Sequence, residues 1–127
     1  MEPLIPTEVA RFVEKHIRSL DQLEVLLLVS ALPDREWTVE AVDAIVRSNP
    51  NAVSQWLEEF VQSGLLIRSA EPPMYRYAPK SDELARSVAA LGSTYKLCRH
   101  KVVELIYSRP ASSIRSFSDA FRFKKKD

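Results

Sequence analysis

The sequence predicts a mainly α-helical protein with one small β-hairpin and a long C-terminal helix. Three observations predict this fold class. Five segments place apolar residues at the spacing of one helix face, and hydroxyl or amide side chains typical of helix starts precede most of them. Two short extended runs flank a pair of prolines. The last helical segment continues from about residue 82 to 108, which is unusually long for so small a chain.

The composition is that of an ordinary soluble domain. A chain of 127 residues suits one domain, and 46% hydrophobic and 28% charged residues exclude a disordered or membrane protein. No apolar run approaches the roughly 20 residues that span a bilayer, and the first residues do not resemble a secretion signal. Cys98 is the only cysteine, and no histidine, cysteine and carboxylate spacing indicates zinc. We therefore expect a cytoplasmic protein without metal or cofactor.

The first two helices are marked by an apolar stripe and a capping pattern. Val9, Phe12 and Ile17 predict a helix that begins after Pro6. Ser19 and Gln22 then form a capping box, in which the hydroxyl caps the helix and the amide reaches back to the backbone of Ser19. The second helix continues to Pro33 and is apolar on so many sides that it should be the central buried helix.

Two further helices follow on either side of a tight turn. Glu36-Trp37 leaves room for only a residue or two of extended chain before Thr38, which is a suitable N-cap for a short third helix. Asn49 and Pro50 suit the N-cap and first position of a fourth helix, which therefore starts at once. Gly64 lies where this helix needs a left-handed residue to end.

The remainder predicts a hairpin and a long helix. Residues 65–68 and 75–78 are the two strands, and Glu71-Pro72-Pro73 forms the tip because proline does not fit a central strand. Ser81 caps a helix from about 82 to 108, which Arg109-Pro110 ends. The spacing of the apolar residues continues unchanged across Gly92. One continuous helix is therefore preferred over two, with a kink at Gly92 as the alternative.

Apolar residues along this long helix recur every four and three positions, which is the spacing of a coiled-coil seam. The stripe is too long for one small core to cover, so it predicts a homodimer interface. In the alternative, its first half packs on the first two helices of the same chain and only the second half meets a partner. The seam residues are Leu84, Val88, Leu91, Tyr95, Cys98, Val102 and Leu105.

The charge distribution separates a basic tail from the domain. We expect residues 1–108 to form one winged domain and residues 109–127 to form the tail. Residues 1–50 carry 5 Lys or Arg against 9 Asp or Glu, whereas residues 109–127 carry 6 against 2. The tail would therefore contribute to binding of a polyanion; a merely solubilising tail is the alternative. Its candidate phosphate contacts are Arg115, Arg122, Lys124, Lys125 and Lys126.

The predicted elements follow the order of a winged helix-turn-helix. This order is helix, helix, short strand, helix, turn, helix, strand, wing tip, strand and long helix. Residues 38–66, with Gly64-Leu65 leading into the wing, resemble the reading unit of the MarR and PadR transcriptional regulators. The resemblance covers roughly residues 20–105 and implies a DNA-binding regulator that acts as a dimer on double-stranded DNA. Residues 114–122 also resemble the tail of small bacterial proteins of this build, which implies no activity.

The resemblance implies that the fourth helix is the recognition helix and enters a major groove. Its outward face, opposite the apolar stripe, is Asn51, Gln55, Glu58 and Gln62, flanked by Ser54 and Glu59. Asn and Gln can pair with adenine through two hydrogen bonds, whereas carboxylates are repelled by phosphate. Because the wing tip is acidic, only Arg68 and Arg76 on the strands could contact the DNA backbone. The candidate DNA contacts within the domain are Arg47, Asn49, Asn51, Ser54, Gln55, Arg68 and Arg76.

The alternative function is a winged-helix module that binds another protein through the partly acidic fourth helix and does not bind nucleic acid. The scarcity of Lys and Arg on the outward face favours this alternative, and the basic tail favours DNA. An enzyme is not expected. His16 and His100 have no partners in the pattern, and the two glycines cannot form a phosphate loop. Adjacent carboxylates such as Glu58-Glu59 point in different directions on a helix and cannot act together on one bond.

Overall fold

The computed structural model describes residues 5–69 and 71–107. It confirms a mainly α-helical fold with a small β-wing. The predicted tail, residues 109–127, lies outside the described residues. The elements are α1 (Thr7–His16), α2 (Leu20–Ala31), α3 (Val39–Val46), α4 (Pro50–Gln62), β1 (Leu66–Ser69), β2 (Met74–Tyr77), α5 (Asp82–Leu97) and α6 (Arg99–Tyr107).

Four helix starts have the predicted caps. In each, a side-chain oxygen accepts a hydrogen bond from the backbone N–H three residues later, which satisfies a donor that the helix start leaves unpaired. The capping residues are Ser19, Thr38, Asn49 and Ser81. The box at α2 differs in one detail, because Gln22 Oε1 accepts from the N–H of Arg18 at 2.7 Å rather than from that of Ser19.

The end of α4 follows the predicted pattern as well. Gly64 has φ +83°, a left-handed conformation that glycine adopts without strain. Its N–H bonds to Val61 O at 3.0 Å, and the N–H of Leu65 bonds to Phe60 O at 2.9 Å. This pair of bonds is the Schellman motif, and it turns the chain out of α4 and into β1.

The wing is an antiparallel pair in which Leu66 lies opposite Tyr77 and Arg68 opposite Tyr75. The turn at its tip contains Glu71-Pro72-Pro73, as expected. Trp37 forms an isolated β-bridge beside β2, because it exchanges two backbone hydrogen bonds of 2.8 Å with Tyr75. The expected extended residue before α3 therefore ties the wing to the start of the helix-turn-helix.

The prediction of one continuous helix from about 82 to 108 is wrong. The helix breaks at Cys98, where φ −145° and ψ 64° leave the helical region, and Gly92 lies inside α5. The N–H groups of Lys101 and Val102 bond to Cys98 O and start α6. A straight helix of that length would extend about 40 Å, well beyond a small core. The break instead turns α6 back onto α1.

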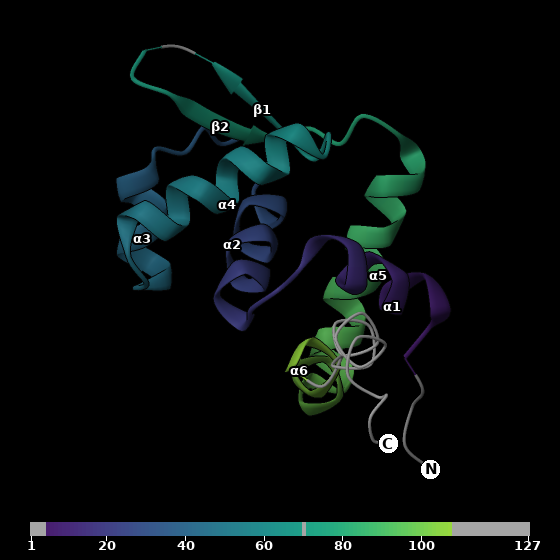
Figure 1. Cartoon of the computed structure of the whole chain (residues 1–127). Helices are drawn as coiled ribbons and strands as arrows, with labels where there is room; N and C mark the ends of the chain where they lie inside the picture. Colours follow the sequence, from purple (N-terminus) through teal and green to yellow (C-terminus); the bar gives the residue numbers. More distant parts are fainter. Residues whose placement is uncertain (1–4, 70, 108–127) are drawn as a thin grey trace, which may run out of the picture.

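The helices divide into two groups around α2 (Figure 1). On one side lie α3, α4 and the wing, and on the other lie α1, α5 and α6. Contacts of α2 with α3, α4, α5 and β2 join the two groups, which explains its predicted central position. Leu23, Leu26, Leu57 and Phe60 are buried in the shared core. None of the helices in the described ranges is long and apolar enough to cross a membrane.

Candidate nucleic-acid interface

The candidate interface is the side of α4 that faces away from the core. Val53, Leu57 and Phe60 fix this orientation because they are buried against α2 and the rest of the domain. On the opposite side Asn51 and Gln55 are exposed, and Ser54 is half-buried. The structure thus brings these three predicted residues together in the first two turns of α4, where they face outward.

Two other candidates lie at the turn before α4 and have local structural roles. Asn49 Oδ1 accepts from the N–H of Ala52 at 3.0 Å, so this oxygen serves as the helix cap. Arg47 adopts a left-handed conformation with φ 61°, and its N–H bonds to Asp43 O at 2.7 Å, while its side chain is exposed. Arg47 is therefore an exposed cation in the turn that precedes α4, whereas Asn49 mainly stabilises the helix start.

Glu58 connects α4 to the wing. Its Oε2 accepts from the hydroxyl of Tyr75 at 2.5 Å and pairs with Arg68 Nε at 3.1 Å. Burial, followed by the hydrogen bond to Glu58, raises the pKa of Tyr75 to about 12, so this hydroxyl remains a donor at neutral pH. Arg68, predicted as a phosphate contact, is thus held by a carboxylate on α4.

The two predicted wing arginines lie on opposite faces of the hairpin. Neighbouring residues of a strand alternate between faces, so Arg68 and its partner Tyr75 share the face toward α4. Arg76 lies opposite Ile67 on the other face, and it is half-buried. A single nucleic-acid backbone contacting one face of the wing would therefore meet only one of these arginines.

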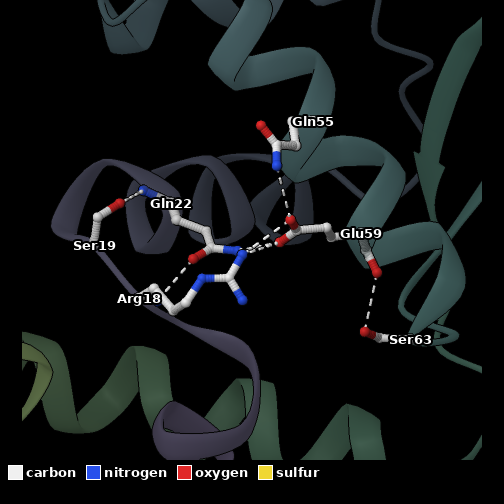
Figure 2. A network of polar contacts seen from close by, with 6 residues as sticks. All are labelled: Arg18, Ser19, Gln22, Gln55, Glu59 and Ser63. Carbon is white, nitrogen blue, oxygen red and sulfur yellow. Dashed lines mark hydrogen bonds and ion pairs between the residues drawn. The ribbon is translucent and has the colours of Figure 1, made fainter. Parts of the chain in front are cut away.

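Glu59 is held by Arg18, in the turn between α1 and α2, and by Gln22, in the first turn of α2 (Figure 2). Arg18 Nη2 lies 2.9 Å from both carboxylate oxygens, and Gln22 Nε2 donates to Oε1 at 3.2 Å. Sequence reasoning missed Arg18 and did not connect Gln22 with Glu59, because only the fold brings residues so distant in sequence together. Each of the two carboxylates on this side of α4 is consequently paired with an arginine of the same chain.

The predicted dimer seam lies largely inside the chain. Val88, Leu91, Cys98 and Val102 are buried, and the Cys98 thiol donates to Thr94 O at 3.4 Å. The other three seam residues, Leu84, Tyr95 and Leu105, are half-buried and pack against the same core. The single chain thus already covers most of the stripe. The predicted tail contacts Arg115, Arg122, Lys124, Lys125 and Lys126 lie outside the described residues.

The remaining candidates have structural surroundings. His16 lies 4.6 Å from Phe12, measured between ring centroids, and burial lowers its pKa below the usual value. His100 is exposed. Within residues 5–69 and 71–107, no three histidine, cysteine or carboxylate side chains are grouped as metal ligands. A mainly apolar pocket of about 480 Å³ lies between α2 and α5, with Leu27 and Gly92 in its lining.

The fold is similar to several solved structures. The transcriptional regulator MosR of M. tuberculosis is 18% identical, with a TM-score of 0.51 over 88% of this chain and 82% of its own. RV1404 from Mycobacterium tuberculosis is 13% identical, with a TM-score of 0.52 over 89% and 78%. MarR from E. coli in its reduced form is 10% identical, with a TM-score of 0.50 over 94% and 98%. No protein-family model and no curated protein matches the chain. The likeness confirms a MarR-like winged helix fold.

Proposed function

We propose that this MarR-like winged helix protein binds double-stranded DNA as a transcriptional regulator, with α4 in the major groove. The observation that carries this function is the outward face of α4. Asn51 and Gln55 are exposed there, and their amides suit the edges of bases. Glu58 and Glu59, which would repel phosphate, are paired with Arg68 and Arg18. These four side chains together carry no net charge, so the main objection to a DNA-binding α4 is reduced.

We further propose that the protein acts as a homodimer and that the basic tail contributes phosphate contacts. Four seam residues are buried in their own chain, so a dimer would use the partly exposed Leu84, Tyr95 and Leu105 together with their surroundings. The alternative function, a protein-binding module, depended on Glu58 and Glu59 as an acidic docking surface. Both carboxylates already have partners within the chain, and we therefore favour DNA.

Selection from a random duplex pool tests the proposed function. We expect the full chain to enrich a preferred site and to bind generic duplex DNA more weakly. For generic DNA, the logarithm of affinity should fall linearly with the logarithm of salt concentration, by about 0.9 per phosphate contact. A folded chain that enriches no sequence and shows no salt-dependent binding contradicts DNA recognition. In that case the protein-binding module becomes the better explanation.

Replacing Glu58 with Gln should strengthen binding to generic DNA. The change removes a negative charge from α4 and releases Arg68, while an amide oxygen still accepts from Tyr75. Both Glu58 and Arg68 are about 40% exposed, and such surface pairs contribute little stability, so the fold should persist. We expect about three- to tenfold tighter binding and a salt slope steeper by about 0.9, corresponding to one new phosphate contact.

The matched control for Glu58→Gln is the double variant Glu58→Gln with Arg68→Gln. The double variant lacks the released cation, so its salt slope should return to that of the wild-type chain. If the single variant binds more weakly than the wild type, or if both variants gain affinity equally, Arg68 is not the group that Glu58 withholds.

A further inference from the structure

A chain of polar contacts ties Gln55 to the turn between α1 and α2 (Figure 2). Gln55 Nε2 lies 3.5 Å from Glu59 Oε2, one turn further along α4. The Glu59 carboxylate in turn lies 2.9 Å from Arg18 Nη2 through each of its oxygens. We infer that Arg18 and Glu59 are positioning residues that hold the Gln55 amide in the orientation needed to recognise a base.

The inner end of this chain is fixed by burial. Gln22 is 1% exposed, and its Oε1 accepts from the N–H of Arg18 at 2.7 Å. Its Nε2 donates to Glu59 Oε1 at 3.2 Å, so Glu59 is the partner of a buried amide. Losing that partner would leave a buried donor unsatisfied, which is costly. The carboxylate therefore has a defined orientation when it meets the exposed Gln55.

Glu59 determines which end of the Gln55 amide points outward. An ionised carboxylate only accepts hydrogen bonds, so it holds the amide nitrogen and leaves the amide oxygen directed away (Figure 2). The amide nitrogen has two N–H donors. One donates a hydrogen bond to Glu59, and the other, beside the amide oxygen, remains available. In the major groove adenine offers a donor at N6 beside an acceptor at N7, and the held amide matches that pair. The expected target of Gln55 is thus adenine.

Holding the amide before binding reduces the freedom that Gln55 loses on the DNA. The contact of 3.5 Å between Gln55 Nε2 and Glu59 Oε2 is the longest of this series of polar contacts. It therefore restrains the Gln55 side chain without adding much stability. Immobilising a flexible side chain at an interface has a modest free-energy cost, and removing the restraint should lower selectivity about three- to tenfold. Since this role rests on the proposed DNA binding, its test must separate the two.

The test is a double-mutant cycle on selectivity. The probes are the duplex that the wild-type chain selects and a variant of it in which one A·T pair is replaced by G·C. The informative A·T pair is the one whose replacement by G·C does not change the affinity of the Gln55→Ala variant. We expect Arg18→Met to lower the ratio of the two affinities about three- to tenfold in the wild-type background and not at all in Gln55→Ala. Arg18→Lys keeps a cation beside Glu59 and should retain most of the selectivity.

A purely structural role for Arg18 would not produce this pattern, because a loss of folded protein lowers binding to both duplexes equally. Equal loss of selectivity in both backgrounds, or none in either, overturns the positioning role. A second measurement needs no DNA: the side-chain amide resonances of Gln55 should shift in Arg18→Met and Glu59→Gln. A wild-type chain that selects no duplex overturns DNA binding itself. Selective binding with unresponsive Gln55 resonances overturns only the positioning role.

Discussion

Replacing Val102 with Glu is expected to unfold the chain. Val102 is 0% exposed and belongs to the core that α1, α5 and α6 share. A carboxylate at this position would be buried, and the buried core of the described residues contains no cation to pair with it. An unpaired buried charge costs about 3–5 kcal/mol. That is a large part of the 5–15 kcal/mol that stabilises a typical domain. Thermal unfolding followed by circular dichroism would measure the loss.

Leu105→Glu is the matched control, because Leu105 lies on the same helix and is only half-buried. This variant should remain folded. Because we propose that Leu105 contributes to a homodimer, the mass of the Leu105→Glu protein in solution should fall to that of a monomer, as light scattering would show. A Val102→Glu chain that is folded and monomeric would contradict the structure, since it would mean that Val102 faces a partner rather than its own core.

The break at Cys98 explains why much of the predicted seam lies inside its own chain. Leu84 to Leu105 keep a regular four-and-three spacing, and no proline or glycine marks the change from α5 to α6. The break arises because α6 packs against α1, a contact that local sequence does not encode. It leaves Leu97 75% exposed and turns Val102 inward. A pattern that indicates an apolar stripe does not say whether the stripe meets its own chain or a second copy.

The elements with local signals were predicted well. Ser19, Thr38, Asn49 and Ser81 cap their helices because the capping bond joins residues three apart. Gly64 ends α4 for the same kind of local reason.

The electrostatics of the site depended on distant residues and could not be predicted in this way. Glu58 and Glu59 were expected to repel phosphate, yet each meets an arginine from another part of the fold. The sequence contained those arginines without indicating their partners.

Asn51→Ala is expected to reduce binding to the selected duplex by about 1–3 kcal/mol while leaving binding to generic DNA nearly unchanged. Asn51 is exposed in the first turn of α4, and its side chain makes no hydrogen bond among the described residues. Its amide is thus available for a base, and its loss should not affect the fold. Titrations of both duplexes at one salt concentration would measure the difference.

Two neighbouring residues provide the controls for Asn51. Asn49→Ala removes the helix cap and should lower the free energy of unfolding by about 1 kcal/mol, without changing the ratio of the two affinities. Arg47→Ala should weaken binding to both duplexes alike, because an exposed cation beside α4 is expected to contact the DNA backbone rather than the edges of bases. If Asn51→Ala weakens both duplexes equally, or neither, the first turn of α4 does not recognise bases, and base recognition by this helix would depend on Gln55.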